Sequence, residues 1–114
     1  MNLSLSPSLA WIVLVAAGAL EIVWSLSMKA SDGFTRGFYT AITIAAASLS
    51  FWLLGLSLKA LPVGTAYAVW TGIGAVGAAV LGVVLFNEPA SASRIACIAL
   101  IVLGIVGLKL TGGQ

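Results

Sequence analysis

Residues 9–28 read LAWIVLVAAGALEIVWSLSM, an apolar run in which Glu21 is the only charged residue. These twenty residues would form a helix as long as the hydrocarbon core of a bilayer, roughly 30 Å at 1.5 Å of rise per residue. Glu21 is the thirteenth residue of the run, so it is predicted to lie near the membrane midplane. An ionisable group there costs about 2.5 to 3.5 kcal/mol on insertion scales and usually handles ions or protons. The sequence therefore indicates a functional carboxylate inside a membrane.

The composition supports an integral membrane protein. The chain is 61% hydrophobic and 7% charged, whereas an ordinary soluble domain is about 25% charged. No basic residue precedes Trp11, and the first run is longer than a signal-peptide core and contains a glutamate, so it is predicted to remain as a helix. The chain has no histidine and one cysteine, Cys97, which excludes an internal disulfide, a zinc site and Cys/His catalysis. We therefore expect no metal, no cofactor and no enzymatic activity. The net charge of +2 is too small to suggest a nucleic-acid partner.

Three further apolar runs complete a predicted all-α membrane fold, a single domain over residues 1–114. The four spans are expected at about 9–28, 38–58, 63–86 and 95–110. Polar or proline-containing breaks separate them at residues 29–36, 59–62 and 87–89.

The distribution of basic residues predicts an unusual topology. Four spans place both termini on one side of the membrane. One side then carries two basic residues, Lys59 and Lys109. The other side carries three, which are Lys29, Arg36 and Arg94. The positive-inside rule needs a clear excess to set one orientation, so copies are predicted to insert both ways. Transporters often place their site between inverted halves, and an oppositely inserted second copy would supply one. We expect an antiparallel, dual-topology homodimer whose two membrane glutamates converge.

The helical neighbours of Glu21 suggest how the carboxylate is held. Gly18, Trp24 and Ser25 are three or four positions away and share its face. Gly18 would leave room beside the carboxylate, while Trp24 and Ser25 could donate hydrogen bonds to it. A purely structural glutamate, bonded to a partner helix, is the less favoured alternative.

The third span carries Tyr67 and Trp70 on one helical face. Their rings and donors could line a cation site. They could equally belong to the aromatic belt found at membrane interfaces, and the spacing alone leaves both interpretations open.

The same span contains a false nucleotide-binding motif. Residues 72–77 read GIGAVG, but they lie inside an apolar membrane run, and the next acid, Glu88, comes only 11 residues after Gly77. Glycines clustered in a membrane helix favour bending and close contact. We therefore interpret Gly72 and Gly74 as a hinge.

Other polar and small residues of the later spans allow weaker assignments. Ser48, Ser50 and Ser57 are hydroxyls that commonly bond their own helix, so composition promotes none of them. Glu88 is expected to cap the fourth helix or its loop. Small-residue spacing predicts a dimer contact formed by Cys97, Ile101 and Gly104.

Three stretches carry a resemblance that covers essentially the whole chain. They are AGALEIVW at 17–24, KASDGFTR at 29–36 and AYAVWTGIG at 66–74. With them the chain resembles the small multidrug resistance family, and within it the guanidinium-exporting branch. Trp24 is the main reason for choosing this branch, because drug exporters of the family typically have a small residue there. The family's fourth-helix contact usually begins with glycine, where this chain has Cys97.

The resemblance implies a proton-coupled antiporter that exports guanidinium and small guanidinyl cations across the bacterial inner membrane. It also implies that the hinge of the third helix falls at Gly72–Gly74. The substrate- and proton-binding residues that it implies are Glu21, Trp24, Ser50, Tyr67 and Trp70. Two alternatives remain at this stage: an exporter of lipophilic quaternary ammonium ions, or a non-transporting small subunit of a membrane complex.

Overall fold

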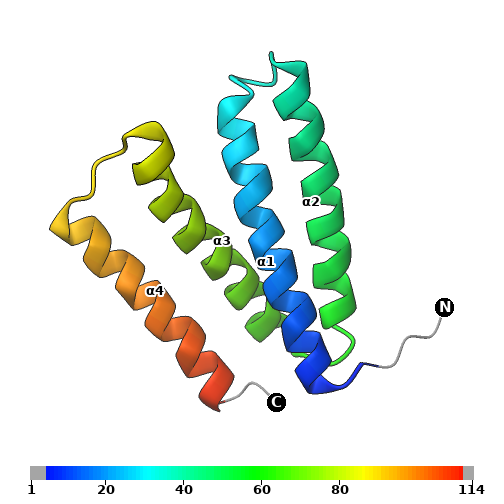
Figure 1. The fold of residues 1–114 in the computed structure, drawn as a ribbon. Coiled ribbons are helices and arrows are strands. Elements are labelled where there is room, and N and C mark those ends of the chain that lie inside the picture. Colours follow the sequence, from blue (N-terminus) through cyan, green and yellow to red (C-terminus); the bar gives the residue numbers. More distant parts are fainter. Residues whose placement is uncertain (1–4, 112–114) are drawn as a thin grey trace.

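The computed structural model describes residues 5–111, and its regular elements in that range are α-helices (Figure 1). They are α1 (Pro7–Ala30), α2 (Gly37–Ser57), α3 (Val63–Phe86) and α4 (Ala92–Thr111). All four are long and apolar enough to cross a membrane. The predicted all-α architecture with four membrane-spanning helices is thereby confirmed. The helices α1 and α4 begin two and three residues before the predicted spans, because their first turns include polar residues that hydropathy does not count.

Local capping explains where these two helices begin. Pro7 occupies the first turn of α1, where its missing N–H is not needed, and the Ser6 Oγ accepts a hydrogen bond from the Leu9 N–H at 3.2 Å. At the start of α4 the Ser91 Oγ accepts from the Arg94 N–H, also at 3.2 Å. Each serine thus satisfies one of the backbone donors that a helix N-terminus leaves unpaired.

The turn between α1 and α2 is built around a buried serine. The Ser31 Oγ donates to the Met28 carbonyl at 2.6 Å and accepts from the Phe34 N–H at 3.0 Å. Asp32, Gly33 and Phe34 all have positive φ angles, which reverse the direction of the chain within a few residues. This tight turn aligns α1 and α2 side by side.

The four helices form a flat assembly rather than a closed bundle. The Cα atoms extend over 40 × 37 × 16 Å. Helix α1 lies between α2 and α3, whereas the backbone of α4 approaches α3 alone (Figure 1). The core contains Leu14, Ala17, Ala66 and Val69, and α4 contributes no buried residue to it.

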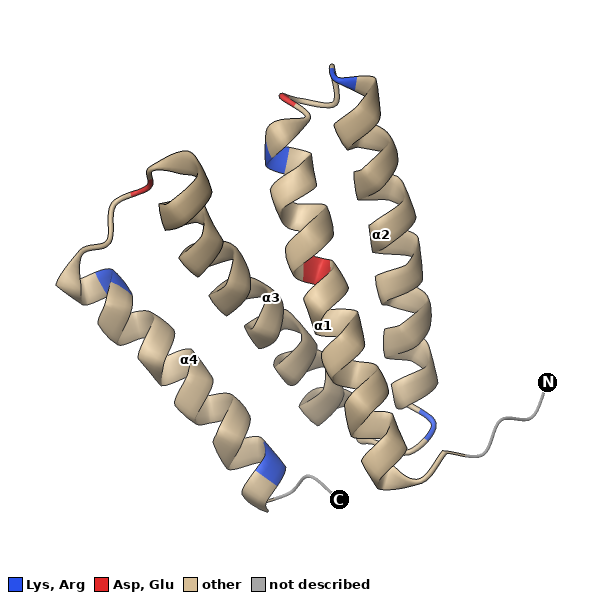
Figure 2. Cartoon of the chain, in the orientation of Figure 1, with Lys and Arg blue, Asp and Glu red and all other residues tan. Residues whose placement is uncertain are grey.

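The charged residues separate into two ends and one interior position (Figure 2). The turns α1–α2 and α3–α4 share one end, and the α2–α3 turn and the C-terminal part of α4 share the other. Between them, α1 carries Glu21 near the middle of its length. Among residues 5–111 no other acid or base lies within the central part of a helix.

Candidate functional site

The carboxyl group of Glu21 lies directly against Gly74 of α3. A methyl group added at Gly74 would overlap the Glu21 carboxyl and would approach its Cγ to 2.6 Å. The α1–α3 contact therefore accommodates the carboxylate only because residue 74 has no side chain. The Glu21 Oε1 is buried and has no hydrogen-bond partner among residues 5–111. A buried acceptor without a partner is costly, which makes this oxygen a strong candidate for binding a proton or a donor-rich cation.

Trp24 presents a matching unpaired donor one turn further along α1. Its Nε1 is buried and, within the described part of the chain, has no hydrogen-bond partner. Its ring packs edge-on against Phe51 of α2, with centroids 6.1 Å apart. The Ser25 Oγ donates to the Ile22 carbonyl of its own helix at 3.0 Å. In this single chain, the expected hydrogen bonds from Trp24 and Ser25 to the carboxylate are therefore absent, since a nearby backbone carbonyl competes for the serine hydroxyl.

Ser50 connects the three packed helices. It is completely buried, its Oγ donates to the Ala17 carbonyl of α1 at 2.7 Å, and it accepts from the Trp70 Nε1 of α3 at 2.9 Å. The other described serine and threonine hydroxyls of α2 bond to carbonyls of their own helix or of its N-cap; these are Thr40, Thr43, Ser48 and Ser57. Among these serines and threonines, Ser50 is thus the one that fixes an interhelical position, and composition alone could not single it out.

An aromatic row runs from α1 across α2 to α3. The ring of Phe51 lies 5.6 Å from that of Trp70, and Trp70 lies 5.6 Å from Tyr67, measured between centroids. Trp70 is 6% exposed and is part of the core, so its ring packs inside the chain. Tyr67 is 57% exposed, so both interpretations remain for it. Sequence reasoning missed Phe51, because one more apolar residue in an apolar helix gives no signal.

The glycines expected at the site serve as points of close contact. A methyl group at Gly18 would come within 2.8 Å of Ile73, so Gly18 makes room for α3 and not for the carboxylate. The residue that makes room for Glu21 is Gly74. A methyl group at Gly72 would come within 2.7 Å of Ile105 of α4. Helix α3 is continuous through both positions, so the hinge stays a prediction.

The Ser50 bonds give a testable difference between two serines of the same helix. Ser50→Ala leaves the Ala17 carbonyl and the Trp70 indole without this partner, and we expect a loss of about 1 to 3 kcal/mol in the free energy of unfolding. Ser48→Ala removes an exposed bond to the Ile44 carbonyl and is expected to cost under about 0.5 kcal/mol. Unfolding of the purified proteins by sodium dodecyl sulfate measures both. Equal stability of the two variants would contradict the connecting role of Ser50.

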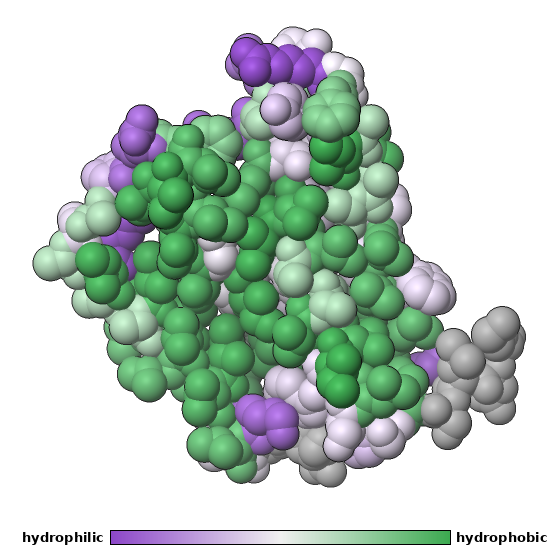
Figure 3. Space-filling model, viewed as in Figure 1, coloured by the Kyte–Doolittle hydropathy of each residue, from purple (hydrophilic) through white to green (hydrophobic). Residues whose placement is uncertain are grey.

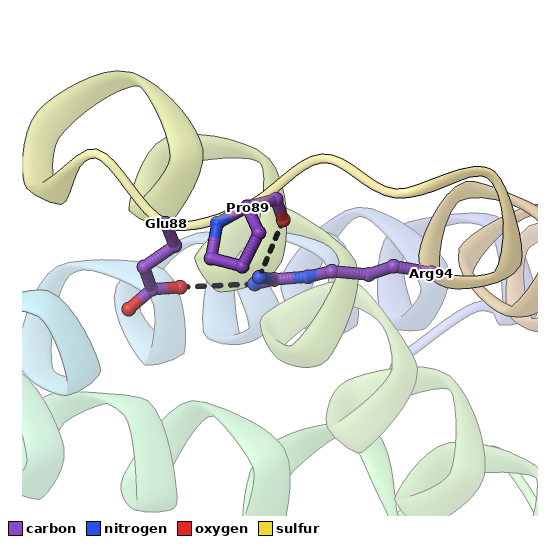
Figure 4. Close-up of polar contacts among 3 residues, drawn as sticks. All are labelled: Glu88, Pro89 and Arg94. Carbon is purple, nitrogen blue, oxygen red and sulfur yellow. Dashed lines mark hydrogen bonds and ion pairs between the residues drawn. The ribbon is translucent and has the colours of Figure 1, made fainter.

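Glu88 lies outside this site and belongs to the α3–α4 turn. Its Oε1 pairs with the Arg94 NH2 at 2.9 Å, and the Arg94 NH1 donates to the Pro89 carbonyl at 2.9 Å (Figure 4). The α4 N-terminus is capped by Ser91 instead. Glu88 was expected to cap either the fourth helix or its loop, and in the structure it stabilises the loop.

The predicted dimer contact on α4 is open in the single chain. Cys97, Ile101 and Gly104 are all exposed. A methyl group at Gly104 would meet nothing within 4 Å. The pairing of this face stays a prediction.

Comparison with known proteins places these features in a family. Residues 9–101 match the family model described as Small Multidrug Resistance protein. A protein of Escherichia coli K12 named guanidinium exporter is 56% identical over 103 residues, which are 90% of this chain and 98% of that protein. The guanidinium exporters of Yersinia pestis and Citrobacter freundii are 55% and 54% identical, each over 90% of this chain and 98% of their own. These matches confirm the resemblance seen in the sequence.

Proposed function

Because this chain belongs to the small multidrug resistance family, we propose that it exports guanidinium-type cations from the bacterial cell in exchange for protons. It is a multi-pass protein of the inner membrane and a transporter, not an enzyme. The observation that carries the proposal is the buried Glu21 Oε1 beside Gly74, which has no hydrogen-bond partner in the described part of the chain. Membrane carboxylates in this setting are typical of cation and proton sites.

The chemistry of guanidinium fits a carboxylate site with few other charges. The ion is planar and rich in N–H donors, so a carboxylate can hold it by paired, charge-assisted hydrogen bonds. The exposed ring of Tyr67 offers a cation–π contact. Trp70 packs beside that ring and is held in place by the Ser50 hydroxyl. Trp24 narrows the site with its ring, and its free indole N–H is available to orient a carboxylate. A small, planar cation suits this arrangement better than a bulky one.

We further propose that the working unit is an antiparallel homodimer. The chain is 16 Å thick at its Cα atoms, so it covers a bound cation from one side only. Helix α4 has no buried residue and leaves the Cys97, Ile101 and Gly104 face open for a second copy. The balanced basic residues on the two sides allow copies to insert in both orientations. Two Glu21 carboxylates would then face one central site.

Coupling of cation export to proton uptake follows because the cation and the protons compete for the two Glu21 carboxylates. Protons and the cation each neutralise the same negative charge, so binding of one displaces the other. A dimer in which neither carboxylate binds a proton or a cation would carry two uncompensated charges at the membrane midplane. The exchange of its inward and outward faces is therefore disfavoured. Bending of α3 at Gly72 and Gly74 would exchange the inward and outward faces of the loaded dimer.

Transport by the purified protein tests the proposal directly. In liposomes with an acidic interior, we expect accumulation of guanidinium that stops when the pH gradient is collapsed. Tetrapropylammonium, offered under the same conditions, should be carried at less than a tenth of that rate. Preference for the quaternary ion would support drug export instead, and failure to transport either ion would support a non-transporting subunit. Protein-free liposomes provide the control for leak.

A further inference from the structure

A long apolar trough runs along the outer surface between α1, α3 and α4. Its lower part, about 370 Å³ in volume, is lined by residues that include Trp11, Ile73 and Val106, with Lys109 at its edge. Its upper part, about 350 Å³, shares Ile73, Ile105 and Val106 with the lower and continues to Ile22 and Gly77. We call these two connected parts the α4 trough. Apart from Lys109 its lining side chains are apolar.

The length of the α4 trough matches one leaflet of a bilayer. From Trp11 to Ile22 the wall formed by α1 rises over eleven residues, which is roughly 17 Å of helix. Half of a hydrocarbon core is about 15 Å. The trough therefore begins near the membrane surface, at the start of α1 and the end of α4, and ends near the midplane.

A positive charge lies at the surface end of the trough. The Lys109 Nζ sits 5.2 Å from the centroid of the Trp11 ring, and none of the ion pairs found among residues 5–111 includes it. That end of the molecule carries Lys59 and Lys109 and, within the same range, no acid (Figure 2). At the opposite end a smaller apolar groove is bordered by Arg94, but Glu88 neutralises that arginine. Figure 3 shows the hydrophobic face with a hydrophilic patch near the end of α4.

We propose that the α4 trough binds an anionic phospholipid of the surrounding bilayer. One acyl chain lies in the trough and the phosphate contacts the Lys109 ammonium. An apolar channel of one-leaflet length that ends in a lysine ammonium is complementary to such a lipid in both polarity and charge. A lipophilic substrate cation does not fit, because Lys109 repels it.

A second copy of the chain is disfavoured as the occupant by the geometry of α4. Val102, Ile105, Val106 and Lys109 face the trough. The proposed dimer face, defined by Cys97, Ile101 and Gly104, is centred roughly a third of a turn away around the helix. Lipid and partner can therefore bind α4 at the same time, and lipid binding does not depend on transport.

Substitution of two lysines on the same side of the membrane distinguishes lipid binding at the trough from attraction by the general surface charge. Native mass spectrometry of the purified protein, titrated with dioleoyl phosphatidylglycerol, measures the dissociation constant of the bound lipid. We expect Lys109→Gln to weaken it about fivefold and Lys59→Gln to leave it within a factor of two. Dioleoyl phosphatidylcholine should bind the native protein about as weakly as phosphatidylglycerol binds Lys109→Gln. Equal weakening by both substitutions, or no change in either, would overturn the proposal.

A second pair of variants tests the acyl-chain position. Val106→Trp fills the trough while Lys109 remains, so phosphatidylglycerol binding should fall at least fivefold. Ile44→Trp adds the same ring to the exposed side of α2 and should leave binding unchanged. The same spectra report the ratio of dimer to monomer, which should stay at its native value in both variants. Loss of the dimer in Val106→Trp alone would show that a second copy, rather than a lipid, covers the trough.

Discussion

Glu21→Gln is expected to abolish proton-driven guanidinium transport while the protein still inserts and folds. The amide has nearly the same shape, so it fits beside Gly74. It can neither take up a proton nor neutralise a cation. Loss of charge-assisted hydrogen bonds, each contributing about 1.5 to 3 kcal/mol, corresponds to at least a hundredfold weaker cation binding. Guanidinium uptake into liposomes under a pH gradient, and calorimetric binding in detergent, measure both effects.

An acid outside the membrane provides the matched control for this substitution. Asp32 lies in the α1–α2 turn at a φ of 52°, where asparagine is also tolerated, and it is exposed. Asp32→Asn makes the same change of charge and should retain transport near the native rate. Glu21→Asp keeps the charge but withdraws it by one methylene from Gly74, so an intermediate rate is expected. Substantial proton-driven uptake by Glu21→Gln would remove Glu21 from the mechanism.

The membrane architecture could be predicted because the patterns that indicate it are local in the sequence. A run of about twenty apolar residues has few alternatives to a spanning helix, which is why the four-helix fold was predicted correctly. Glu21 was equally visible, since a single charge in such a run is costly and therefore informative. The family resemblance depended on short stretches around the same residues and is confirmed by the comparisons. Organisation as one domain stays a prediction.

Contacts between helices could not be predicted from the sequence. Helical spacing correctly placed Gly18 on the face of Glu21, but it could not show that Ile73 occupies the space beside Gly18 or that Gly74 faces the carboxyl. The same limit applies to Ser48 and Ser50, which have similar surroundings in the sequence and different partners in the structure. Only the family resemblance favoured Ser50. Residues three or four apart on one helix are predictable neighbours, whereas the facing residue depends on how two helices cross.

Three added lysines in the α2–α3 region are expected to force a single orientation and to eliminate transport. Leu58, Val63 and Gly64 are exposed, and a methyl group at Gly64 would meet nothing within 4 Å, so lysines fit at all three. They raise the basic count on that side to five against three, which should place the termini in the cytoplasm. Copies inserted one way cannot form an antiparallel pair. Fluorescent and phosphatase fusions at the C-terminus measure orientation, and resistance of cells to guanidinium measures function.

Rescue by an oppositely biased copy makes this test specific for the antiparallel dimer. Lysines at the exposed positions Gly37 and Ser93 raise the other side to five against two. That variant should also fail alone, and co-expression of the two should restore resistance, because each copy supplies the orientation that the other lacks. Glutamines at positions 58, 63 and 64 control for the loss of the native side chains and should leave both orientations and function intact. A uniform orientation of the native chain, or full function of either lysine variant alone, would refute the antiparallel dimer, since a parallel pair needs only one orientation.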